Sequence, residues 1–77
     1  ARGAVTFAFR SEDARTDLAV WDVTGRRVAT LLRGSRAAGS VTWNGRDDDG
    51  RPSPAGVYLV RLASRAGSVS RRLVWIP

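Results

Sequence analysis

The stretch VTWNGRDDDGRPSPAGVYLVRL, residues 41–62, decides the fold. An alternating run ends at Trp43 and leads into a polar turn that contains three consecutive acids. Gly50 closes this turn, and Gly56 opens an apolar run that passes through Tyr58. Glycine supplies the positive φ that tight turns need, and the two prolines between these glycines stiffen the connection. The stretch therefore predicts two strands joined by an ordered turn.

The rest of the chain consists of similar short alternating runs separated by turn signals. Val and aromatic residues outweigh Leu and Ile among the larger apolar side chains, which favours strands. Strand signals recur about every ten to twelve residues, a spacing typical of antiparallel sandwiches and small barrels. We predict six strands, near residues 5–10, 16–23, 27–32, 40–44, 57–63 and 69–76.

Two segments leave alternatives open. Residues 28–33 include several good helix formers, so a helix competes with the third strand, although so short a segment nucleates a helix poorly. Residues 51–55 offer a seventh strand, which Pro52 and Pro54 would confine to a sheet edge. Neither alternative changes the prediction of an all-β domain.

The composition narrows what this chain of 77 residues can do. It has no Cys and no His, so disulfides, thiolate metal sites and the usual general base are absent. The net charge is +6, and all 13 basic residues are Arg. A basic balance favours anionic partners, but no run exceeds two adjacent Arg, so we expect a solvated surface and no nucleic-acid partner. No apolar run approaches the ~20 residues of a membrane span.

The chain lacks the residues that usually activate a catalytic nucleophile. The seven Ser have no His or Lys to activate them, and nucleophilic catalysis needs such a base within hydrogen-bond reach. Carboxylate pairs can cleave glycosides, but the three acids of the central turn offer no cleft in so small a domain. We therefore expect no enzyme activity and no cofactor.

Two motifs resemble those of a known family. Residues 18–28, LAVWDVTGRRV, are similar to the hairpin pattern L-x-V-Y-D-x-x-G-R-x-V. Residues 39–58 are similar to the pattern G-x-x-x-W-D-G-x-D-x-x-G-x-x-x-x-x-G-x-Y. Both patterns belong to the FlgD-type immunoglobulin-like domain, which is named after a flagellar hook-capping protein and resembles the type IX secretion sorting-like, C-terminal domains of bacterial secreted proteins. The residues that carry the resemblance are Asp22, Gly25, Trp43, Gly45, Asp47, Gly50, Gly56 and Tyr58.

This resemblance implies an all-β, antiparallel immunoglobulin- or fibronectin-III-like β-sandwich of about seven strands. It also implies that residues 1–77 form a single domain, the C-terminal module of a larger bacterial protein that is secreted or held at the cell surface. The implied partners are neighbouring domains of that protein, secretion machinery, a cell-surface polymer, or further copies joined through strand edges. The implied role is structural: a spacer, or a module for secretion or attachment.

The acidic turn also suggests a calcium site, because hard cations favour clustered carboxylates. Asn44, Asp47 and Asp49 would supply the oxygen ligands. The spacing does not match an EF-hand loop, and no Glu closes the site. The alternative is a β-turn in which Asp side chains accept backbone N–H groups, and we favour it. Similarly, Asp22 is expected to make turn contacts and an ion pair with Arg26.

The aromatic residues allow two interpretations. Trp43 and Tyr58 lie on the faces expected to point inward, so we predict both in the core, with the Tyr58 hydroxyl hydrogen-bonded. Trp21 and Trp75 lie beside apolar neighbours and could cover a flank or a neighbouring domain. A row of exposed rings would instead form a carbohydrate-binding platform.

The sequence leaves three functions to compare. The first is the non-catalytic structural module described above. The second is a module that binds a glycan or another anionic polymer through Arg side chains and an exposed Trp. The third is a subunit of an extracellular assembly, joined by strand addition at open sheet edges in residues 57–62 and 69–76.

Overall fold

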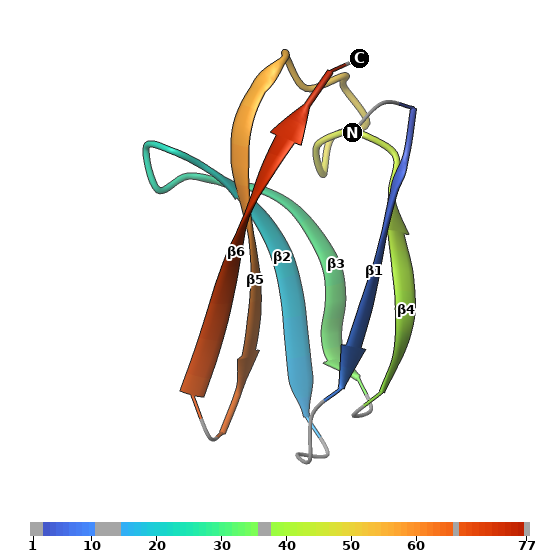
Figure 1. The fold of residues 1–77 in the computed structure, drawn as a ribbon, viewed down its shortest axis with the longest axis vertical. Coiled ribbons are helices and arrows are strands. Elements are labelled where there is room, and N and C mark those ends of the chain that lie inside the picture. The colour runs from blue at the N-terminus through green and yellow to red at the C-terminus, as the bar shows by residue number, and fades with distance from the viewer. Residues whose placement is uncertain (1–2, 11–14, 36–37, 66, 77) are drawn as a thin grey trace.

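The chain forms two antiparallel sheets packed face to face (Figure 1). The computed structural model describes residues 3–10, 15–35, 38–65 and 67–76. A two-stranded sheet, β1-β4, faces a four-stranded sheet in the order β3-β2-β5-β6. This arrangement confirms the predicted all-β sandwich. The strands are β1 (Val5–Arg10), β2 (Thr16–Asp22), β3 (Arg27–Ser35), β4 (Ala38–Trp43), β5 (Gly56–Ser64) and β6 (Gly67–Trp75).

The core follows from alternation along the central strands. In β2, Leu18 and Val20 are buried, and their register partners in β5 are Leu62 and Val60. Paired residues in a sheet point to the same face, so these side chains form the inner surface of the four-stranded sheet. The buried cluster between the sheets consists of Val20, Ala29, Trp43, Tyr58 and Trp75.

The structure decides between the alternatives for residues 28–33 and for residues 51–55. The helix alternative for residues 28–33 is wrong, because this segment lies within β3 and pairs with β2. Pairing with β2 puts Ala29 in the buried cluster. The stabilisation from this pairing and burial outweighs the helix propensity of the segment. Residues 51–55 form no strand either. Pro52 makes only an isolated bridge to Arg46, so six strands are found in the described residues.

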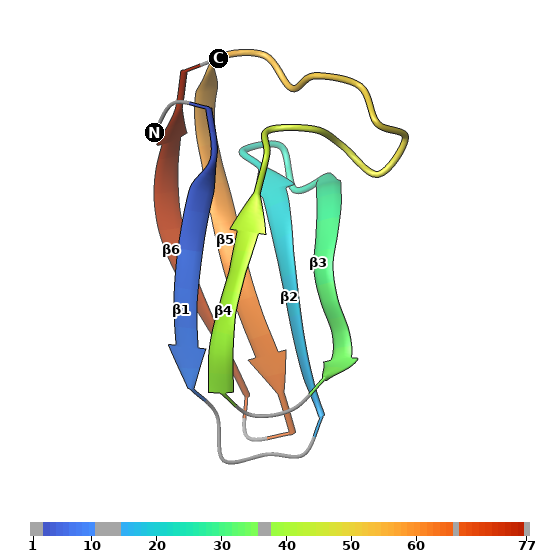
Figure 2. The same cartoon turned by 90° about the vertical axis from the view of Figure 1, so that its right-hand side faces the viewer.

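The connection between β4 and β5, residues 44–55, is the longest loop that the structure describes. It lies at the same end of the sandwich as the tight turn between β2 and β3 (Figure 2). Both segments that resemble the FlgD pattern therefore meet at one end of the molecule. The described chain contains no helix long and apolar enough to cross a membrane.

Candidate functional site

The acidic turn is held together by the side chain of its first acid. Asp47 Oδ1 accepts the backbone N–H groups of Asp49 and Arg51, both at 2.9 Å. The Gly50 N–H donates to the Asp47 carbonyl at 2.9 Å, and the Asp47 N–H donates to the Arg51 carbonyl at 2.9 Å. Gly50 has a φ of 82°, a conformation that glycine adopts without steric cost. The carboxylate thus closes the turn on its own backbone.

The turn between β2 and β3 repeats this arrangement. Asp22 Oδ1 accepts the N–H groups of Thr24 and Arg26, both at 3.0 Å, and the Thr24 hydroxyl at 2.6 Å. The Asp22 N–H donates to the Arg26 carbonyl, and the Gly25 N–H donates to the Asp22 carbonyl, as in the acidic turn. The carboxylate of Asp22 therefore contacts Arg26 at the backbone N–H group of Arg26. The pattern D-x-x-G-R, which occurs at residues 22–26 and 47–51, could have revealed this repetition in the sequence.

The second acid of the turn reaches a neighbouring strand. The Asp48 N–H donates to the Val28 carbonyl at 3.0 Å, and Asp48 Oδ1 accepts the Thr30 N–H at 2.8 Å. β3 lies at the edge of its sheet, so these bonds occupy backbone groups that face away from β2. Exposed strand edges promote unwanted pairing, and covering them is a usual remedy. Asp48 therefore covers part of this edge.

The start of the loop is fixed to the core. The Trp43 Nε1–H donates to the Arg46 carbonyl at 2.9 Å, and Asn44 Oδ1 accepts the Arg46 N–H at 3.0 Å. The Ser53 N–H donates to the Gly45 carbonyl at 2.7 Å, which joins the two arms of the loop. The loop is therefore positioned by a buried indole as well as by its own turn.

The aromatic residues form one cluster beneath this loop. Trp43 packs edge-on against Tyr58 at a centroid distance of 5.4 Å and tilted against Trp75 at 4.9 Å. The Tyr58 hydroxyl donates to the Pro54 carbonyl at 2.6 Å, as the predicted buried Tyr requires, and burial raises the pKa of Tyr58. Trp75 is 3 % exposed, so it belongs to the core and does not cover a flank.

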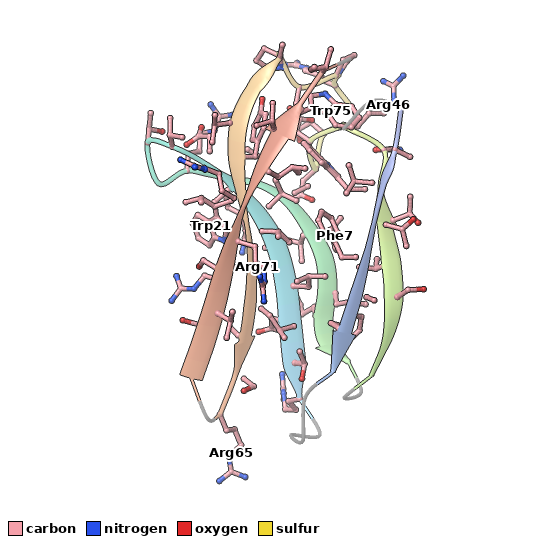
Figure 3. All side chains as sticks on the ribbon, in the orientation of Figure 1. Phe7, Trp21, Arg46, Arg65, Arg71 and Trp75 are labelled. Carbon is pink, nitrogen blue, oxygen red and sulfur yellow. The ribbon has the colours of Figure 1, made fainter. Side chains whose placement is uncertain are left out.

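Trp21 lies on the opposite side of the four-stranded sheet, away from β1 (Figure 3). Its ring is half-buried, and its register partners are Arg27 in β3 and Leu59 in β5. A hollow of about 180 Å³ lies on this outer face beside Trp21, Arg27 and Arg61. This face brings an aromatic ring and cationic side chains together, and Asp17, whose carboxylate accepts the Gly34 N–H, also lines the hollow.

The two D-x-x-G-R turns border one cleft of about 370 Å³. Four of the residues predicted from the sequence line it, while Trp43 and Gly45 lie apart from it in the core. Ser53 also lines the cleft, but the chain contains no His or Lys to activate it. Within the described residues, the polar groups beside this cleft order the two turns. The four lining residues are Asp22, Asp47, Gly56 and Tyr58.

Comparison with known proteins identifies the family. The model of the FlgD Ig-like domain matches residues 1–68. The chain belongs to the FlgD Ig-like domain family. Its structure is similar to that of FlgD from P. aeruginosa, with a TM-score of 0.64 and 26% sequence identity over 92% of this chain. The match covers 58% of that protein, and no curated protein matches the chain.

Membership in the FlgD Ig-like family agrees with the chemistry of the loop. The family is bacterial and is not a known enzyme family. Asn44 Oδ1 and Asp47 Oδ1, two of the oxygens that would bind calcium, already accept backbone N–H groups. Within the described residues, no group of three or more His, Cys, Asp or Glu could hold a metal ion. The turn interpretation is therefore favoured, and calcium binding stays a hypothesis.

Asp47 is expected to contribute more than Asp49 to the free energy of unfolding of this FlgD Ig-like domain. Asp47→Ala removes the acceptor of two backbone N–H groups and should lower the free energy of unfolding by about 1–2 kcal/mol. Asp49→Ala removes the same charge from an exposed side chain and should change it by less than about 0.5 kcal/mol. Urea unfolding of both variants checks this expectation. Equal losses would contradict the role given to Asp47.

Asp22 should make the domain sensitive to acid. The hydrogen bond from the Thr24 hydroxyl, followed by the bond from the Arg26 N–H, lowers the pKa of Asp22 below its usual 3.8. A lowered folded-state pKa stabilises the fold above the unfolded-state pKa, and this stability is lost as the pH falls through the folded-state value. Wild type should therefore exceed Asp22→Asn in unfolding free energy at pH 7, with the difference shrinking below the usual pKa. A difference independent of pH, measured by urea unfolding, would refute the assignment.

Proposed function

We propose that this FlgD Ig-like domain is a non-catalytic accessory module of a larger bacterial protein, with a role in flagellar hook assembly or a comparable structure. The observation that carries the proposal is that two carboxylates of the acidic turn bond the backbone of the domain itself. The carboxylate of Asp47 bonds its own turn, and that of Asp48 bonds β3, so the polar groups of the loop stabilise the domain.

The same proposal includes a setting outside the cytoplasm. The domain would serve as a C-terminal spacer or attachment module of a secreted or surface protein, and a relation to type IX sorting domains would make it a secretion signal. Its partners would be neighbouring domains and secretion machinery. A domain without Cys folds without disulfides, so this stability does not depend on an oxidising compartment.

Deletion of residues 1–77 from the parent gene tests this function. The parent protein should keep its activity per folded molecule, while assembly, secretion or surface attachment falls. Asp49→Ala in the full-length protein serves as a folded control. Loss of a catalytic rate constant, with assembly and location intact, would overturn the accessory role.

A second candidate function is supported by the outer face of the four-stranded sheet. Arg27, Trp21, Leu59 and Arg72 form one cross-strand row, and Arg61 lies in the next row. Planar rings flanked by Arg can stack on sugars and pair with acidic groups, so this face suits an anionic glycan.

Heparin-column retention tests this binding function. Trp21→Ala combined with Arg61→Gln should lower the salt concentration needed for elution. Arg65→Gln together with Val23→Ala, at exposed turn positions, matches the loss of charge and should elute like wild type. Equal elution of both double variants would exclude a site on this face.

A further inference from the structure

Two strand edges face one groove on the side of the sandwich away from β3. β1 ends the two-stranded sheet, and β6 ends the four-stranded sheet. A groove of about 530 Å³ is lined by residues of both strands. In Figure 2, β1 lies in front of β6 at this side of the molecule. The two-stranded sheet therefore leaves part of the larger sheet uncovered.

The floor of this groove is the hydrophobic core. Leu18 and Val60, which are 3% and 7% exposed, line it together with the half-buried Phe7, Phe9 and Leu73. Phe7 points between the two sheets (Figure 3). At the entrance, Val69 of β6 is 58% exposed. An occupant of the groove would therefore remove apolar surface from water.

The edges of the two sheets differ in how they are covered. On β3, Asp48 bonds the backbone of Val28 and Thr30. Within the described chain, the backbone of β1 pairs on one side only, with β4. β1 is therefore free to accept a further strand, which would extend its sheet to three strands. β5, in contrast, pairs with both β2 and β6, so the open edge predicted at residues 57–62 does not exist.

Arg71 and Arg72 both line the groove, and the register of β6 places Arg71 on its inner face. Arg71 pairs in register with Val60, whose side chain is buried on the inner face, so Arg71 also points to the inner side of β6 (Figure 3). The lining contains no acidic residue of the described chain. An inward-pointing charge on an edge strand discourages pairing with apolar strands. The same charge favours a strand that brings a carboxylate.

We propose that this groove binds an extended strand of a partner protein, which pairs with β1, turns alternate apolar residues towards the core and places an acidic residue opposite Arg71. A second copy of this chain does not fit. Only β2 among the described strands contains acids, and β2 is paired on both sides. The net charge of +6 also makes copies repel each other. The groove can accept such a strand whether or not the domain acts in hook assembly.

Labelled peptides of alternating Val and Thr with a central Glu, Gln or Lys test this proposal by fluorescence anisotropy. Wild type should bind the Glu peptide about tenfold more tightly than the Gln peptide, and the Lys peptide least tightly. Arg71→Gln should remove this preference, and Arg71→Glu should reverse it. Arg65→Glu makes the same charge change at the exposed β5–β6 turn and should leave the order intact (Figure 3).

Hydrogen exchange identifies the edge that is used. The Glu peptide should slow amide exchange within β1 and leave the amides of β3 unchanged. Three results would overturn the proposal: equal affinity for the Glu and Lys peptides, the same change in Arg65→Glu as in Arg71→Glu, or protection at β3. Concentration-dependent dimers in light scattering that dissociate when the Glu peptide is added would show that a second copy occupies the groove, which also contradicts it.

Discussion

Replacing Trp43 with alanine is expected to remove a large part of the free energy of unfolding of the domain. The side chain is 1% exposed and contacts both Tyr58 and Trp75, so its removal opens a cavity at the centre of the core. Truncation of a buried Trp costs about 3–5 kcal/mol, and a domain of this size has a total stability of roughly 4–12 kcal/mol. Urea unfolding followed by near-ultraviolet circular dichroism measures the loss.

Two further variants make this expectation specific. Trp43→Phe keeps a ring in the core but removes the Nε1–H that donates to the Arg46 carbonyl, so it should cost less, about 1–3 kcal/mol. Trp21→Ala removes a half-buried ring from the outer face and should cost less than Trp43→Ala. If Trp21→Ala proved the more damaging change, the core described here would be misplaced.

Gly45→Ala is expected to destabilise the domain by about 2–5 kcal/mol. A Cβ at this position would lie 2.0 Å from Trp75 Cζ2, and the φ of Gly45 is 80°. The ring of Trp75 is buried against Trp43, which restricts its movement away from a new Cβ. The substitution therefore combines backbone strain with overpacking of the core, and urea unfolding measures their sum.

Gly50→Ala provides a matched control for this substitution. Gly50 has nearly the same φ, 82°, but a Cβ there would meet nothing within 4 Å. Its cost should be only the backbone strain, about 1–2 kcal/mol. Trp75→Phe replaces the indole with a smaller ring. In the Trp75→Phe background, the loss of unfolding free energy caused by Gly45→Ala should fall close to the loss caused by Gly50→Ala. Equal costs for the two glycines in the wild-type background would show that Trp75 does not restrict Gly45.

The sequence could predict the parts of this fold that depend on local pattern. Alternation located all six strands, and it put Trp43 and Tyr58 in the core, because a residue's face in a strand depends only on its position. The turn glycines were also predictable, since positive φ restricts the residue type. The D-x-x-G-R pattern was visible as well, although only the hydrogen bonds show that both copies form the same turn.

The remaining features depend on contacts between distant residues. Asp48 bonds Thr30 across 18 positions of sequence, so no local pattern distinguishes it from Asp47 or Asp49. The burial of Trp75 in β6 depends on Gly45, which lies far away in the sequence, in the loop between β4 and β5. The groove beside β1 exists because the smaller sheet has only two strands. A count of strand signals could not show on which side the sandwich stays open.

Hydrogen exchange at the Thr30 amide, measured by NMR in EDTA and again in millimolar Ca²⁺, tests most directly whether the acidic turn is structural. The Thr30 N–H donates to Asp48 Oδ1 at 2.8 Å on the edge of β3 that faces away from β2. If the turn stabilises the domain by itself, this amide should exchange slowly in EDTA, and Ca²⁺ should change neither its rate nor the chemical shifts of Asn44, Asp47 and Asp49. Fast exchange in EDTA that becomes slow with Ca²⁺ would show that the turn is a metal site, and would contradict this account.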